Sequence, residues 1–151
     1  AQQVISGASD KITNTIAKLK EAKIKVIPLA VSGAFHSPLV AEANQQFAKA
    51  LDDYEFQNAD CPVIQNVDGQ KYTEGSSLKE NLAKQMTSSV QWVKTVETAL
   101  GLGAECFIEV GSGKVLSGLI KKIDRSAKVL QVSDPDSLNQ TLEELGCTVA
   151  V

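Results

Sequence analysis

The chain has 151 residues, of which 43% are hydrophobic and 22% are charged, and its formal net charge at pH 7 is −3. This length suffices for one domain with a real core, and the composition is ordinary for a globular protein. The weakly negative charge favours neither nucleic acid nor a membrane surface as a partner, and no apolar run approaches the roughly 20 residues that span a bilayer.

Patterns typical of strands and of helices alternate along the chain. Runs rich in apolar and β-branched residues predict strands at residues 3–6, 25–31, 62–67, 105–110 and 128–132. Apolar stripes at helical spacing predict helices that begin after residues 9–10, span 38–52 and 114–124, and start at Ser77, Trp92 and Asp134. The expected N-caps are Ser9 or Asp10, Ser37, Asp134 and a capping box from Ser77 to Glu80. Residues 147–151 read as a frayed tail or an edge strand. This alternation predicts an α/β fold with mainly parallel strand pairing.

The cysteines indicate a cellular location, and the start of the chain indicates whether it is part of a longer protein. Cys61, Cys106 and Cys147 are odd in number and form no CxxC pair. They argue against a disulfide framework and against a metal site, and they predict a reducing, cytoplasmic location. Because a strand pattern begins at once, without a basic leader, we expect a piece of a longer protein. A trimmed but complete domain is the alternative.

His36 is the only histidine, and it follows a predicted strand and the Ser32-Gly33 turn. A helix should begin just after it, because Ser37 is a good N-cap and Pro38 a good first helical residue. Open α/β proteins place their chemistry in crevices at strand ends, and imidazole exchanges a proton readily near neutral pH. His36 is therefore a candidate general base, with a structural role at the helix start as the alternative. The chain contains no G-x-S-x-G nucleophile.

A second motif, EVGSGK at residues 109–114, resembles half a phosphate loop. It lacks the spacing of a Walker A loop and of G-x-G-x-x-G, so we interpret it as a tight strand-to-helix turn that needs glycine. Anion or nucleotide binding there is the alternative. The helix that follows carries a predicted basic strip of four residues, namely Lys114, Lys121 and Arg125 at i, i+7 and i+11, with Lys122 beside them. The strip is either a solvated face or a docking surface for an acidic carrier protein or a coenzyme phosphate.

Three stretches together resemble a single family. They are VSGAFHSPL at residues 31–39, VQWVKTVETALGLG at 90–103 and FIEVGSGKVLSGLIKKI at 107–123, and QQVISG at 2–7 also fits. In sequence, order and spacing they resemble the malonyl-CoA:acyl carrier protein transacylases of fatty-acid biosynthesis. The resemblance covers essentially the whole chain but only the C-terminal half of such an enzyme. The family's G-H-S-x-G serine, oxyanion-hole loop and malonyl-binding arginine belong to the other half, and Arg125, the sole arginine, does not match that position.

The resemblance implies a role for two residues. His36 corresponds to the catalytic base, and Gln85 to the residue whose backbone carbonyl receives the other N–H of the imidazole. That carbonyl would replace the aspartate of a hydrolase triad. The family usually has proline where Ser112 stands, and often where Ser89 stands, so both turns are expected to be looser here.

The reaction implied is transfer of a malonyl group from coenzyme A, through a seryl-enzyme intermediate, to the phosphopantetheine thiol of acyl carrier protein. No cofactor is implied, since the phosphopantetheine is carried by the partner. The expected partners are malonyl-CoA, acyl carrier protein and the N-terminal half of the same enzyme. The chain supplies the histidine but not the serine, so we expect the 151-residue chain alone to be inactive.

The implied fold is an α/β-hydrolase-like acyltransferase core with a small ferredoxin-like subdomain. Residues 1–31 would be the closing half of that subdomain, and residues 32–151 the C-terminal part of the core. An alternative of another class is a stand-alone α/β binding or regulatory module that uses the basic helix as its interaction face.

Overall fold

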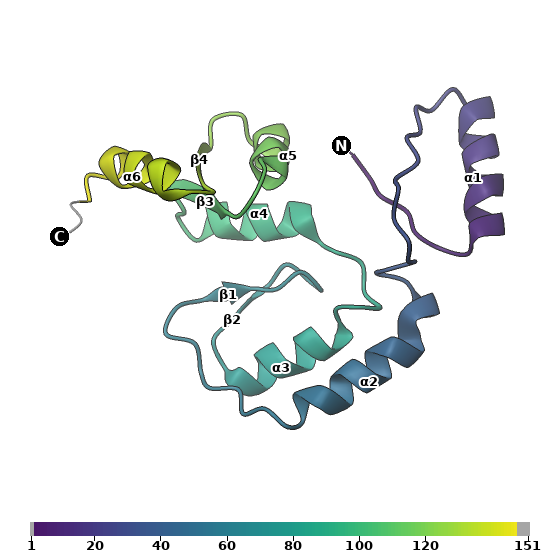
Figure 1. Cartoon of the computed structure of the whole chain (residues 1–151), viewed down its shortest axis with the longest axis horizontal. Coiled ribbons are helices and arrows are strands. Elements are labelled where there is room, and N and C mark those ends of the chain that lie inside the picture. Colours follow the sequence, from purple (N-terminus) through teal and green to yellow (C-terminus); the bar gives the residue numbers. More distant parts are fainter. Residues whose placement is uncertain (1, 148–151) are drawn as a thin grey trace. The chain divides into compact units, whose positions relative to one another are not determined.

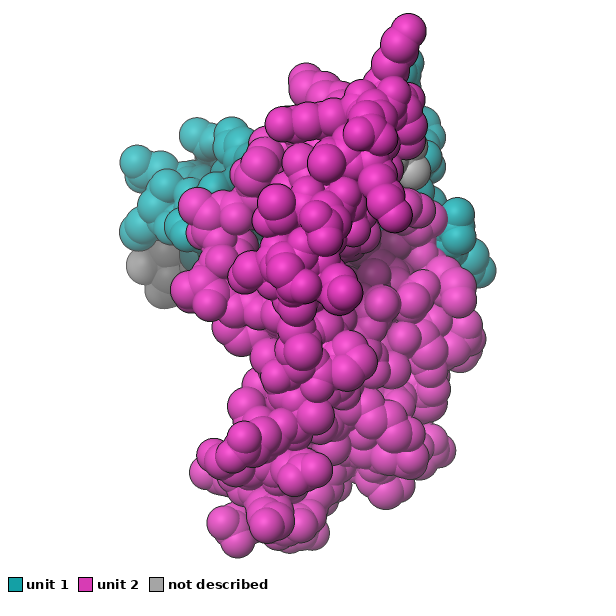
Figure 2. All heavy atoms as spheres, turned by 90° about the vertical axis from the view of Figure 1, so that its right-hand side faces the viewer, with its two compact units in different colours: residues 1, 96–151 teal, residues 2–95 magenta. Residues whose placement is uncertain are grey.

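The computed structural model describes residues 2–147, which form two compact units, 2–95 and 96–147, coloured separately in Figure 2. The boundary between the units falls inside helix α4 (Trp92–Gly101). None of the helices within residues 2–147 is both long and apolar enough to cross a membrane. Of the tail or edge strand predicted at 147–151, residues 148–151 lie outside the described residues.

The unit of residues 2–95 is built from helices and one short hairpin (Figure 1). Its elements are α1 (Ser9–Glu21), the 3₁₀-helix η1 (Pro38–Val40), α2 (Ala41–Leu51), β1 (Val63–Ile64), β2 (Lys71–Tyr72) and α3 (Gly75–Lys84). Strands β1 and β2 pair antiparallel, and Asp68 closes their turn by accepting hydrogen bonds from the Gln70 amide and the Tyr72 hydroxyl. Helix α2 packs along α3, and an ion pair of 3.2 Å joins Asp52 to Lys79.

The unit of residues 96–147 contains a βαβ motif. Its elements after α4 are β3 (Cys106–Val110), α5 (Val115–Ile123), β4 (Lys128–Val132) and α6 (Pro135–Glu144). Strands β3 and β4 pair in parallel, from Cys106 opposite Lys128 to Val110 opposite Val132, and α5 is the crossover. Four residues of this unit are buried, one each in α4, α5 and α6 and one directly before β4, namely Val96, Ile120, Thr141 and Ala127.

The predicted α/β class is confirmed, but two predicted strands are wrong. Residues 3–6 and 25–31 have no regular secondary structure and pair with no strand among the described residues. Their β-branched composition favours a strand, yet a strand also needs a neighbour that takes up its backbone hydrogen bonds. The pairing is also less parallel than predicted, because the 62–67 run contributes only the two-residue strand β1, which forms an antiparallel hairpin.

The two caps predicted from acidic or hydroxyl residues that directly precede proline are confirmed. Ser37 accepts a hydrogen bond from the Leu39 amide at the start of η1, and Asp134 accepts one from the Ser137 amide at the start of α6. Proline already has a helical φ and lacks the N–H that would otherwise need a partner, so the start of the helix is well defined by the sequence.

The other two predicted caps are wrong. Helix α1 begins after Ala8, which provides no side-chain cap, and not after Ser9 or Asp10. Helix α3 begins at Gly75, so Ser77 lies inside it and the capping box does not form. The Gly75 amide instead donates to the side-chain oxygen of Asn58 at 3.0 Å. A residue 17 positions upstream therefore satisfies this helix end, which a local motif cannot reveal.

Candidate active site

His36 lies in the irregular segment directly before η1, and its side chain is exposed. Its φ is +58°, in the left-handed region that residues with a side chain seldom adopt. The neighbouring Ser37 is buried, and its hydroxyl donates to the Ala34 carbonyl at 2.6 Å while accepting from the Leu39 amide at 3.3 Å. These contacts fix the bend in the backbone that leaves the imidazole facing outward.

The His36 ring is held by main-chain oxygens at the end of α3. Nδ1 lies 3.1 Å from the Gln85 carbonyl oxygen and 3.1 Å from the Ser88 carbonyl oxygen. The backbone N–H of His36 donates to the Met86 carbonyl at 2.9 Å. Carbonyl oxygens only accept, so both contacts of the ring require a proton on Nδ1. In the neutral ring with this tautomer, Nε2 carries the lone pair and can accept a proton, as a general base must.

The end of α3 explains why acceptors are available there. The last carbonyl groups of a helix have no intrahelical partner and must be satisfied by other groups. Helix α3 ends at Lys84, and His36 meets the turn that follows. The structure thus brings together the two residues expected from the resemblance, His36 and Gln85. The Ser88 carbonyl was missed, because a main-chain acceptor leaves no signature in a sequence.

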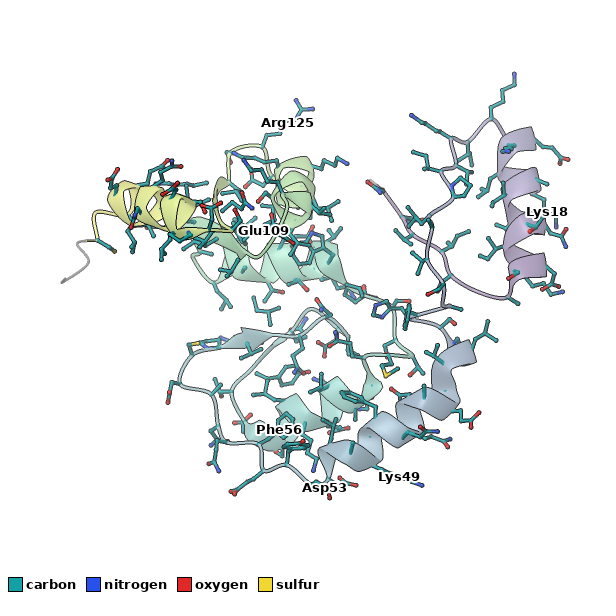
Figure 3. The ribbon with its side chains drawn as sticks, viewed as in Figure 1. Lys18, Lys49, Asp53, Phe56, Glu109 and Arg125 are labelled. Atoms are coloured by element: carbon teal, nitrogen blue, oxygen red, sulfur yellow. The ribbon has the colours of Figure 1, made fainter. Side chains whose placement is uncertain are left out.

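The predicted basic strip lies in the other unit and is not a single helix face. Lys114, Lys121, Lys122 and Arg125 are all exposed. However, α5 ends at Ile123 and Asp124 has an extended backbone, so the helical spacing does not continue to Arg125. Figure 3 shows Arg125 in the turn after α5 with its side chain directed away from the ribbon.

The EVGSGK motif forms the strand-to-helix turn that its glycines predicted. Gly111 and Gly113 have φ values of +136° and +92°, and the Gln131 side-chain amide donates to the Gly113 carbonyl at 2.6 Å. The Glu109 carboxylate accepts hydrogen bonds from the Ser117 hydroxyl, from the Ser117 amide at 2.8 Å and from the Leu116 amide at 3.1 Å. An anion bound at the start of α5 would therefore meet a carboxylate of the chain itself, which disfavours the alternative of an anion site.

Glu109 makes the stability of the protein depend on pH. Hydrogen bonds from the Ser117 hydroxyl and then from the Ser117 amide hold the pKa of Glu109 below its usual value, against the opposing effect of desolvation. A carboxyl whose pKa is lower in the folded state stabilises the fold when ionised, and this contribution is lost as the pH falls through the folded-state pKa.

We expect Glu109→Gln to flatten the pH dependence of stability in the acid range. Between about pH 5 and 3, the urea midpoint of the wild type should fall more steeply than that of the variant. Asp68, Glu80, Asp124 and Asp134 also have lowered pKa values, but they contribute equally to both proteins, so the difference isolates Glu109. Identical slopes would contradict the proposed role of this carboxylate.

No set of three or more His, Cys, Asp or Glu side chains within residues 2–147 is placed to hold a metal ion. Cys61, Cys106 and Cys147 are free thiols.

Together, the fold and the site define an α/β protein in which backbone carbonyls orient an exposed imidazole with its Nε2 free. Proteins known to be similar to this chain are malonyl-CoA:acyl carrier protein transacylases, which confirms the resemblance predicted from the three motifs.

The similarity extends over nearly the whole chain. The malonyl CoA-acyl carrier protein transacylase of Bacillus subtilis (strain 168) is 41% identical over 148 residues, which are 95% of this chain and 46% of the relative. The crystal structure of MCAT from Streptococcus pneumoniae matches with a TM-score of 0.85 and 34% identity, over 91% of this chain and 45% of that one. No protein-family model matches.

A third relative is a malonyl-transacylase solved in complex with a type II PKS acyl-carrier protein. It has a TM-score of 0.86 and 32% identity, over 91% of this chain and 45% of that one. The chain thus spans slightly less than half the length of the curated relatives that it matches.

Proposed function

We propose that the chain is the C-terminal half of a malonyl-CoA:acyl carrier protein transacylase and that His36 is the general base of that enzyme. The observation that carries the proposal is the contact of 3.1 Å between His36 Nδ1 and the Gln85 carbonyl, in a chain that is 41% identical to such transacylases over 95% of its length. The carbonyl fixes the tautomer and orientation of the ring without adding a charge.

In the proposed reaction, Nε2 of His36 takes the proton of a serine hydroxyl supplied by the other half. The serine oxygen attacks the malonyl thioester, and His36 returns the proton to the departing coenzyme A sulfur. The phosphopantetheine thiol of the carrier protein then loses its proton to His36 and attacks the seryl ester. The serine oxygen leaves and takes that proton back. Every step is a proton transfer or an acyl transfer, so no cofactor is proposed.

Exposed apolar side chains support the presence of another half. Val4 and Ile27 are 69% and 68% exposed, and Val110 and Val115 are 79% and 72% exposed. Strand β3 pairs only with β4 among the described residues, so its other edge carries unpaired backbone groups. Proteins cover such edges and large apolar residues, or they aggregate. We propose that the N-terminal half covers these apolar side chains and pairs with this strand edge. Residues 1–31 would then close a ferredoxin-like subdomain, and residues 32–151 would complete an α/β-hydrolase-like core.

The test is transfer of labelled malonyl from malonyl-CoA to holo acyl carrier protein. The chain alone should show no transfer above background, because it has no G-H-S-x-G serine. Coexpression with a polypeptide that carries the missing half should restore transfer. Activity of the purified chain alone would overturn the proposal, as would a folded complex of both halves without activity.

The proposed partner is an acyl carrier protein that is acidic, held by the basic residues Lys114, Lys121, Lys122 and Arg125. The relative solved with an acyl-carrier protein supports this class of partner. All four side chains are exposed, and they are concentrated at the two ends of α5. Opposite charges that face each other across an interface accelerate encounter and disfavour wrong partners.

We expect Lys121→Glu in the complete enzyme to raise KM for the carrier protein about tenfold and to leave KM for malonyl-CoA unchanged. The effect should shrink at high salt, because exposed charges are screened. The matched control is Lys71→Glu, an equal charge reversal at an exposed position of β2. A rise in KM for malonyl-CoA would instead assign the strip to a coenzyme phosphate, and no change in either KM would leave it a solvated face.

The alternative of a stand-alone binding module is not favoured, since the similar proteins are transacylases. The cytoplasmic location stays a prediction, which the three free thiols support.

A further inference from the structure

The His36 ring has two acceptors, not one. Nδ1 lies at the same distance, 3.1 Å, from the carbonyl oxygens of Gln85 and Ser88. Together with the bond from the His36 amide to the Met86 carbonyl, this means that the short segment 85–88 holds both the ring and the backbone of one residue.

The two acceptors differ in how firmly they are themselves held. The Gln85 carbonyl follows directly on α3 and receives the Ser88 amide at 3.4 Å, as the longer branch of a bond that this amide shares with the Lys84 carbonyl at 3.1 Å. The Ser88 carbonyl has no donor other than the His36 ring in the part of the chain that the structure describes. Its direction therefore depends on the backbone torsions of Ser88 and on the peptide that joins it to residue 89.

We propose that Ser88 is a positioning residue whose backbone carbonyl, paired with that of Gln85, holds the imidazole in one orientation with Nε2 outward. A donor placed between two acceptors resists rotation in both senses, whereas a donor with one acceptor can pivot about it. The relevance of this orientation to catalysis rests on the proposed role of His36 as a base, but the geometry itself does not.

Residue 89 controls this second acceptor. The Ser89 amide makes no hydrogen bond within residues 2–147, so a proline there would remove none. Proline restricts the residue before it to extended conformations, which would narrow the directions open to the Ser88 carbonyl. Glycine at 89 would widen the range of the backbone. The two substitutions at position 89 should therefore have opposite effects on how tightly the direction of the Ser88 carbonyl is restricted.

The test is nitrogen NMR of the imidazole in the complete enzyme, with the His36 signals identified by their loss in His36→Asn. Nδ1 should be protonated in the neutral ring. Exchange of its proton with water should slow about threefold in Ser89→Pro and quicken about threefold in Ser89→Gly. Ser89→Ala, which removes only an exposed hydroxyl and imposes neither the restriction of proline nor the freedom of glycine, is the matched control and should change nothing. The kcat for malonyl transfer should be higher than that of the wild type in Ser89→Pro and lower in Ser89→Gly, with KM for malonyl-CoA unchanged.

An unprotonated Nδ1, or equal exchange rates in Ser89→Gly and the wild type, would overturn the proposal. Ser89→Gly carries the test should Ser89→Pro fail to fold. If the exchange rates follow the expected order while His36→Asn transfers malonyl at the wild-type rate, the positioning role of Ser88 stands and the proposed role of His36 as a base fails.

Discussion

Replacing His36 by asparagine should lower kcat for malonyl transfer in the complete enzyme about 10²–10⁴-fold, the usual contribution of a general base. Asparagine suits this test because it tolerates the left-handed backbone, here at φ +58°, better than most residues. Its amide can still donate toward the Gln85 and Ser88 carbonyls, but it offers no nitrogen lone pair that accepts a proton. The substitution therefore removes the base with little change in the backbone.

Two measurements distinguish loss of the catalytic base from loss of folding stability. The urea midpoint of His36→Asn should stay close to that of the wild type, and KM for malonyl-CoA should change little while kcat falls. His36→Ala should be as inactive and also less stable, because alanine is strained at a positive φ. Transfer by His36→Asn at near wild-type rate would contradict the proposed role of the imidazole.

The contacts of this ring mark the limit of what the sequence could predict. His36 stands out as the only histidine, but it lies 49 positions before Gln85, and no periodicity or cap relates the two. Only the resemblance to known enzymes paired them. Neither the positive φ of His36 nor the Ser88 carbonyl could be predicted, since both arise where two distant segments meet and neither depends on the type of side chain.

Local signals predicted the elements of the βαβ unit well. The predicted strand at 128–132 coincides with β4, and Asp134 caps α6, because these features depend on neighbouring residues alone. The same reasoning failed for residues 3–6 and 25–31, where β propensity was present and a pairing strand was not. It also misplaced the start of α3, where the cap comes from Asn58. Strand formation and this cap are properties of two segments, whereas a local sequence pattern carries information about only one of them.

The second large effect is expected at the start of α3, where Gly75→Ala should lower the free energy of unfolding by about 3 kcal/mol. Gly75 is buried, and a Cβ added there would lie 2.6 Å from the Phe56 carbonyl carbon and 2.8 Å from the Gln57 carbonyl oxygen. Both are main-chain atoms of the connector beside α3, on which Figure 3 labels Phe56. Main chain cannot rotate aside as a long side chain can, and moving the connector would break the hydrogen bond from Gly75 to Asn58.

The matched control is Gly118→Ala, at a glycine inside α5 where an added Cβ meets nothing within 4 Å. Alanine is the better helix former, so this variant should gain about 0.5–1 kcal/mol. The same chemical change, a single methyl group on a helical glycine, is thus expected to act with opposite signs at the two positions, as urea unfolding would measure. Helix propensity alone would stabilise both variants. A Gly75→Ala protein as stable as the wild type would therefore mean that the connector does not pass so close to α3.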